Sequence, residues 1–114
     1  MSQRPSIANY QRHAILCAGR CCDEEGSRSL LHYMKDLLRS LGVGVDRVRL
    51  NRAGCLGVCR EGAIMLVYPE AVWYCGVDQA GVDRIVREHL LGGEVVEDLL
   101  FHRNQFDQSE GVEA

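Results

Sequence analysis

The stretch CCDEEGSRSLLHYMKDLLRSL, residues 21–41, contains the most regular pattern in the sequence. After a short acidic turn, apolar residues recur every three or four positions, at Leu30, Leu31, Met34, Leu37, Leu38 and Leu41. This spacing places them on one face of a helix, with Ser27 as its N-cap and Gly42 or Gly44 as its stop. The segments on either side of this helix then decide the fold.

Two short segments with strand character flank the helix. RHAILC, residues 12–17, is apolar and ends on a cysteine, and VDRVRL, residues 45–50, alternates apolar and polar side chains as a half-buried strand does. A strand, a helix and a second strand imply a parallel pair joined by a right-handed crossover.

The second half of the chain predicts a hairpin followed by a helix. AIMLVYP, residues 63–69, and AVWYCGV, residues 71–77, are β-rich runs separated by little more than Pro69-Glu70. Asp78 then caps a helix that ends at Gly92-Gly93, with Val82, Ile85, Val86 and Leu90 on one face. The tail VVEDLLF, residues 95–101, is apolar enough to dock on the body. We therefore expect an α/β sandwich with one small mixed sheet.

Length and charge limit the classes of protein to consider. A chain of 114 residues is large enough for one domain with a core of its own, here expected over residues 12–103, with a flexible leader at 1–11 and a disordered tail at 104–114. No apolar run is long enough for a signal peptide or a membrane span, so we expect a cytoplasmic protein. The net charge of -3 and the absence of a basic stripe argue against nucleic-acid binding.

Four of the six cysteines form two pairs in loops that follow predicted strands. Cys17 and Cys22 lie in CAGRCC, and Cys55 and Cys59 lie in the glycine-containing GCLGVC. Because parallel neighbouring strands end at the same edge of a sheet, the following loops are expected to bring four thiols together. A chain that folds without crosslinks has its thiols available for such chemistry.

Three interpretations of the paired cysteines stay open at this point. The thiols have no shared role, or they bind a structural zinc ion, or they hold a [2Fe–2S] cluster on four thiolates. The glycines favour the cluster, because cluster sulfurs accept hydrogen bonds from backbone N–H groups and need a close backbone approach. Gly54 and Gly57 remove side chains where that approach is required.

The stretch GCLGVCREGAIMLVYPEAVWYCGV, residues 54–77, followed by VDRIVREHLLGGEVVEDLLF, residues 82–101, resembles the thioredoxin-like [2Fe–2S] ferredoxin family. That family also supplies cluster subunits to respiratory complex I and to some hydrogenases. The resemblance covers residues 12–103 and implies a thioredoxin-like βαβ-ββα sandwich. It further implies a one-electron carrier, not an enzyme, that shuttles electrons between redox protein partners.

The resemblance also implies which residues hold the cluster. The four family ligands fall on Cys17, Cys22, Cys55 and Cys59. Cys22 fits the second position better than Cys21, because four residues separate it from Cys17 and 32 separate it from Cys55, spacings that resemble those of family members. Cys21 is a possible substitute, and Cys75 is expected to be an extra cysteine.

The resemblance also indicates partner systems and an oligomeric state, and two alternative functions stay open. Relatives occur beside nitrogen-fixation and hydrogenase systems, and ferredoxins of this type pair as homodimers through the region of Trp73 and Tyr74. A zinc-stabilised interaction module is the alternative, and a thiol–disulfide oxidoreductase is a weaker one because neither loop has C-x-x-C spacing.

The four histidines are expected to have ordinary surface or helix-face roles. They are His13, His32, His89 and His102.

Overall fold

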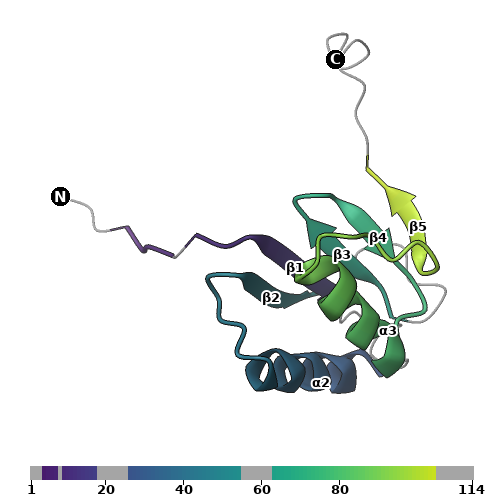
Figure 1. Ribbon diagram of the computed structural model, residues 1–114, viewed down its shortest axis with the longest axis horizontal. Helices are drawn as coiled ribbons and strands as arrows, with labels where there is room; N and C mark the ends of the chain where they lie inside the picture. Colours follow the sequence, from purple (N-terminus) through teal and green to yellow (C-terminus); the bar gives the residue numbers. More distant parts are fainter. Residues whose placement is uncertain (1–3, 8, 18–25, 55–62, 105–114) are drawn as a thin grey trace, which may run out of the picture.

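The computed structural model describes residues 4–7, 9–17, 26–54 and 63–104 (Figure 1). Its elements follow the order β1 (Arg12–Cys17), α2 (Ser27–Ser40), β2 (Val48–Ala53), β3 (Met65–Tyr68), β4 (Val72–Tyr74), α3 (Gln79–Arg84), the π-helical segment η1 (Ile85–Leu90) and β5 (Leu100–Arg103). The predicted tail beyond residue 104 lies outside the described residues.

The strands form one mixed sheet in the order β2-β1-β3-β4-β5. β1 and β2 are parallel and are connected through α2, whereas β3, β4 and β5 add on with antiparallel pairing. The predicted parallel pair, hairpin and mixed sheet are confirmed. β5 was not predicted as a strand: residues 100–103 pair with β4 and complete the sheet at the edge opposite β2.

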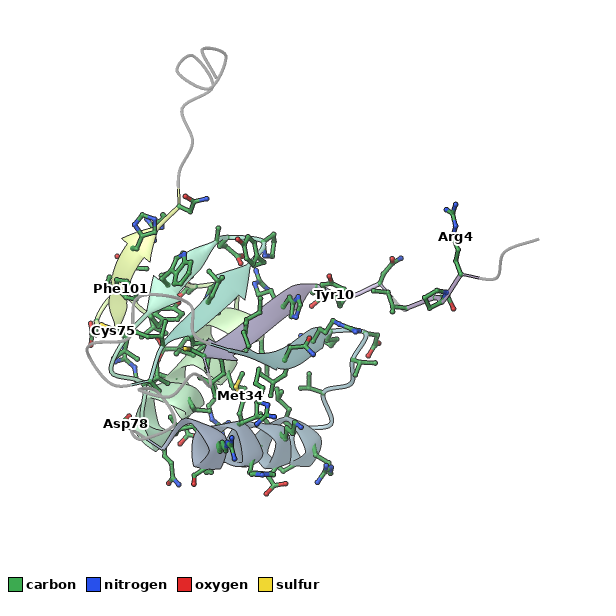
Figure 2. All side chains as sticks on the ribbon, turned by 180° about the vertical axis from the view of Figure 1, so that it is seen from behind. Arg4, Tyr10, Met34, Cys75, Asp78 and Phe101 are labelled. Carbon is green, nitrogen blue, oxygen red and sulfur yellow. The ribbon has the colours of Figure 1, made fainter. Side chains whose placement is uncertain are left out.

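The helices cover one face of the sheet (Figure 1), and the larger of the two apolar clusters among the described residues lies between them and the sheet. α2 contributes Leu30, Leu31, Met34 and Leu38, and Figure 2 shows Met34 between the helix and the strands. The apolar face predicted for the second helix is also buried, at Val82, Ile85, Val86 and Leu90. Removal of this apolar surface from water is the main favourable contribution to folding.

The ends of α2 are set by glycines. The N-cap is Gly26, with a left-handed φ of 87°, so the predicted cap at Ser27 is wrong by one residue. At the other end Gly42 has a φ of 71°, and the N–H groups of Gly42 and Val43 donate to the carbonyls of Arg39 and Leu38. This is a Schellman ending, which confirms the predicted stop at Gly42.

Local geometry accounts for the remaining differences in element boundaries. Arg47 and Val48 both donate to the Gly44 carbonyl, so residues 44–47 form a turn, and β2 begins three residues later than predicted and runs on to Ala53. Asp78 is an N-cap as predicted, because its carboxylate accepts from the Gly81 N–H at 2.8 Å. The second helix is predicted as regular, but its last turns are π-helical.

Candidate functional site

The ends of β1 and β2 meet at one edge of the sheet. Cys17 is the last residue of β1 and lies opposite Ala53, the last residue of β2. The Cys17 thiol donates to the Gly54 carbonyl, with Sγ and O 3.5 Å apart. The two strand ends therefore lie side by side at this edge of the sheet.

Three of the four predicted ligands, Cys22, Cys55 and Cys59, and the possible substitute Cys21 lie outside the described residues. Within the described residues, no three His, Cys, Asp or Glu side chains gather into a metal site. Of the predicted ligands, Cys17 is the one whose surroundings are described, and it lies directly beside Gly54, the residue that precedes Cys55.

Cys17 is fully buried and packs in a small apolar cluster with Ile64, bordered by Trp73 and Cys75. Its backbone N–H donates to the Ile64 carbonyl at 2.9 Å, which fixes the end of the strand. Its sulfur is a soft donor of the kind that iron–sulfur groups use. At Gly54, no described atom lies within 4 Å of where a Cβ would stand. A buried thiol beside a glycine with this space fits a [2Fe–2S] group.

A buried polar cluster around His89 was not predicted from the sequence. His89 is fully buried on the inner face of η1, so of the two expected roles only the helix-face one applies to it, whereas His32 and His102 are exposed. The Tyr74 hydroxyl lies 2.8 Å from His89 Nδ1 and accepts from the Val96 N–H at 3.0 Å, so we assign the hydroxyl proton to the bond with Nδ1. The signal in the sequence was the spacing of His89 from Ile85 and Val86, which places it on the apolar face.

Glu70 and Arg12 complete this cluster at the edge of the core. Glu70 accepts from Arg12 Nη2 at 2.9 Å and from Arg12 Nε at 3.1 Å, and its Oε1 lies 3.2 Å from His89 Nε2. The alignment of this last pair does not meet hydrogen-bond geometry. Since Nδ1 accepts from Tyr74, the neutral imidazole carries its proton on Nε2, toward Glu70.

Burial and charge shift the titration of this cluster. Burial lowers the pKa of His89 below its usual value, and the Glu70 carboxylate only partly offsets this. Burial alone would raise the pKa of Glu70, but hydrogen bonds from Arg12 and from the backbone, together with the nearby His89 N–H, bring it below its usual value. Burial also raises the pKa of Tyr74, so its hydroxyl stays a donor.

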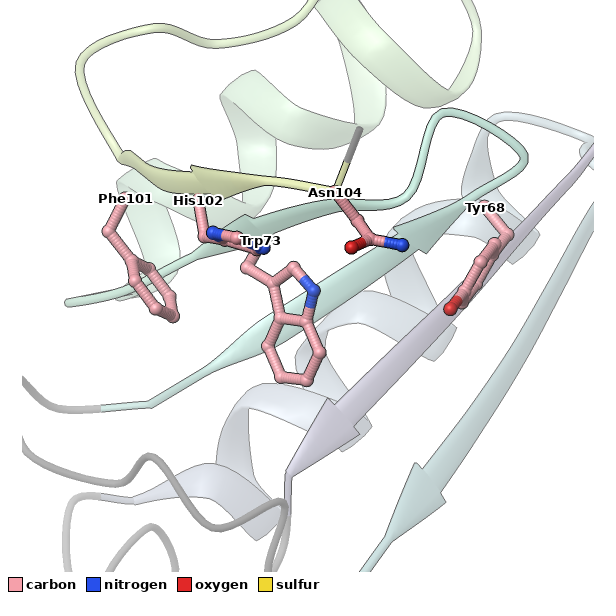
Figure 3. A pocket seen from close by; sticks show the side chains of 5 residues that line it. All are labelled: Tyr68, Trp73, Phe101, His102 and Asn104. Atoms are coloured by element: carbon pink, nitrogen blue, oxygen red, sulfur yellow. The ribbon is translucent and has the colours of Figure 1, made fainter. Parts of the chain in front are cut away.

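An aromatic hollow lies on β4 and β5 (Figure 3). Its volume is about 470 Å³, and it is lined by Tyr68, Trp73, Phe101, His102 and Asn104. The rings of Trp73 and Phe101 meet edge to face, with centroids 6.3 Å apart. Phe101 and Tyr68 are 44% and 43% exposed, which is high for aromatic side chains outside an interface.

None of the helices in the described part of the chain has the length and apolar character needed to cross a membrane.

No protein-family model matches the chain. A [2Fe–2S] ferredoxin of Clostridium pasteurianum is 31% identical over 102 residues, covering 82% of this chain and 98% of its own length. A [2Fe–2S] ferredoxin of Aquifex aeolicus is 32% identical over 84 residues, covering 74% of this chain and 76% of the relative.

Solved structures agree with these relatives. The crystal structure of the wild-type thioredoxin-like [2Fe–2S] ferredoxin from Aquifex aeolicus has a TM-score of 0.72 at 27% identity and covers 82% of this chain and 99% of its own. A variant of that ferredoxin with one cysteine replaced by serine has a TM-score of 0.73 at 29% identity, covering 81% of this chain and 99% of the variant. This chain therefore belongs to the thioredoxin-like [2Fe–2S] ferredoxins, electron carriers that contain a [2Fe–2S] cluster.

Proposed function

We propose that this ferredoxin holds its cluster on Cys17, Cys22, Cys55 and Cys59 and shuttles single electrons between redox enzymes of the cytoplasm. The observation that carries the proposal is the pairing of Cys17 with Ala53 at the ends of two parallel strands. This pairing supports a shared site, because one loop with predicted ligands follows each strand. Enzymes of nitrogen-fixation or hydrogenase systems are the partner classes we propose.

Residues of the chain hold Cys17 in place and shield its sulfur from water. The ladder between β1 and β2 fixes Cys17, and the apolar cluster with Ile64 and Trp73 keeps water from its sulfur. The cluster, when bound, supplies the one-electron redox chemistry. Backbone N–H groups near the sulfurs and the extent of burial then tune the reduction potential.

Spectroscopy with metal analysis tests the function directly. We expect purified protein to be brown, to bleach with dithionite, and to contain two iron and two sulfide per chain, the stoichiometry of a [2Fe–2S] centre. Visible absorption before and after reduction and chemical analysis of iron and sulfide give the result. A colourless protein with one bound zinc would instead establish the zinc-stabilised interaction module, and disulfide turnover by metal-free protein would establish the thiol–disulfide oxidoreductase.

We also propose that two copies pair through the aromatic hollow on β4 and β5. Large exposed aromatic side chains gathered in one place favour a protein interface. Phe101→Arg places a charge in this surface, so we expect the dimer to dissociate into monomers. Sedimentation equilibrium of the wild type and the variant measures this.

A matched substitution elsewhere controls for the added charge. Val45 is 67% exposed and lies just before β2, at the other edge of the sheet. Val45→Arg should leave the protein dimeric. A monomeric wild type, or equal dissociation of both variants, would refute the proposed interface.

A further inference from the structure

Positive charge gathers along the edge of the sheet that β2 forms. Residues 35–52 carry five cations, Lys35, Arg39, Arg47, Arg49 and Arg52, against two carboxylates, Asp36 and Asp46. Asp36 is engaged by Arg39 at 3.3 Å. Arg47, Arg49 and Arg52 form no ion pair with any residue in the described part of the chain.

The segment made of α3, which packs beside α2, of η1 and of the turn after it has the reverse balance. Residues 78–98 carry six carboxylates and two arginines. Arg84 is paired there with Glu88 and Asp98, and Arg103 of β5 is paired with Glu97. The net charge of -3 is therefore the sum of a basic β2 edge and acidic segments elsewhere, residues 78–98 among them.

The basic edge leads to the proposed cluster site. Arg52 lies opposite Leu16 in the parallel ladder, one position before the pairing of Cys17 with Ala53. Arg49 lies further back along the strand, with its guanidinium carbon 5.9 Å from the centre of the Tyr10 ring. A partner that engages these arginines would thus be held beside Cys17 and Ala53, the strand ends that precede the other predicted ligands in the sequence.

A groove runs between α2 and β2 at this edge. Its volume is about 300 Å³; Leu38, Val48 and Leu50 line it, and Lys35 and Arg39 lie among its lining residues. β2 is the outermost strand of the sheet among the described residues. Apolar contact, cationic side chains and an outer strand are therefore combined in one surface.

We propose that the β2 edge is the docking surface for an acidic face of a protein redox partner. The inference rests on the proposed electron-carrier function and adds the chemistry of the partner. Guanidinium groups that have no carboxylate partner among the described residues of their own chain gain charge-assisted hydrogen bonds from carboxylates of another. A protein is favoured over a nucleic acid because the basic surface is short and the chain as a whole is acidic.

Paired probes of opposite charge test this proposal. Dithionite-reduced holoprotein is mixed in a stopped-flow instrument with basic cytochrome c or with the same cytochrome after succinylation of its lysines, which makes it acidic. With the wild type, we expect the rate for the acidic probe to fall as salt is added. The double variant Arg49→Gln/Arg52→Gln should lower that rate by about tenfold at low salt, the lower end of electrostatic steering.

A control variant removes the same charge elsewhere. Arg4 lies on the extended N-terminal segment away from the sheet (Figure 2), and Arg87 is exposed on η1. Arg4→Gln/Arg87→Gln should retain the wild-type rate with the acidic probe. The ratio of the rates for the two probes isolates docking, because a changed reduction potential alters both rates in the same direction.

The possible outcomes separate the two proposals. A protein without the [2Fe–2S] spectrum would refute the carrier function itself. An intact spectrum with an unchanged ratio of rates in Arg49→Gln/Arg52→Gln would refute only the docking surface. Binding of a single-stranded oligonucleotide with the same dependence on the two arginines, and no effect on the acidic cytochrome, would assign the edge to nucleic acid and overturn the proposal.

Discussion

Replacing Cys17 with serine is expected to abolish the visible absorption of the [2Fe–2S] cluster or to shift it strongly. Serine has nearly the same shape as cysteine but presents a hard oxygen where iron–sulfur groups use a soft thiolate. Cys17 is fully buried at a strand end, so no exposed group replaces it without moving the ladder of β1 and β2. Cys55→Ser and Cys59→Ser should have the same effect. Absorption spectra with iron and sulfide content give the measurement.

Cys75→Ser is the matched control for these variants. Cys75 is half-buried and borders the same apolar cluster as Cys17, so its replacement tests general disturbance of this region without removing a proposed ligand. We expect its spectrum to be unchanged. Loss of the spectrum in Cys75→Ser would show that the proposed ligand set is wrong.

A separate pair of variants decides whether Cys22 or Cys21 is the second ligand. Cys22→Ser should destroy the spectrum and Cys21→Ser should preserve it. The opposite result would move the ligand by one position to Cys21 while leaving the other three proposed ligands untouched. Because the two cysteines are adjacent, the pair is also matched in its place in the chain.

The sequence predicted those parts of the fold whose signal is local. The spacing of leucines in α2, the Asp78 cap and the turn at Pro69-Glu70 depend on a few neighbouring residues, and all three appear in the structure. The parallel pairing of β1 with β2 followed from the crossover rule. The meeting of Cys17 with the Gly54 carbonyl is a consequence of that pairing.

The features that were missed depend on long-range contacts. β5 is a strand because β4 offers it a partner, and its pairing is irregular at Trp73 and Tyr74. His89 looks like a polar helix residue until the Tyr74 hydroxyl, 15 positions away, is brought within 2.8 Å of it. The π-helical geometry of η1 likewise reflects its packing, with the Leu91 N–H donating to the carbonyl of Val86.

The buried cluster of His89 is expected to make the protein less stable as the pH falls from about 7 to about 5. Burial lowers the pKa of His89 in the folded state, so below about pH 6.5, the usual histidine value, the unfolded chain binds a proton that the folded chain does not. Stability therefore declines by up to about 1.4 kcal/mol per pH unit within that window. The lowered pKa of Glu70 adds a further loss at more acidic pH.

Substitution of His89 distinguishes its contribution to the pH dependence of stability from that of the other titrating groups. His89→Gln cannot gain a proton, so its thermal unfolding midpoint should vary much less between pH 5 and 7 than that of the wild type. His32→Gln, at an exposed position of α2, should retain the wild-type dependence. Thermal unfolding of the holoprotein followed by circular dichroism gives these profiles. Equal slopes in the wild type and His89→Gln would contradict the assignment.

Tyr74→Phe tests the same cluster at neutral pH, without relying on the folding of His89→Gln. It removes the donor to His89 Nδ1 and the acceptor of the Val96 N–H while keeping the ring, so the free energy of unfolding should fall by about 1–3 kcal/mol for each buried group left unsatisfied. Nitrogen NMR of the wild-type imidazole supplies an independent measurement. It should show the proton on Nε2 at pH 7, since Nδ1 is assigned as the acceptor from Tyr74, and an imidazole that titrates below pH 6.5, the usual histidine value. An imidazole that titrates at or above pH 6.5 would contradict the effect of burial on which the acid sensitivity depends.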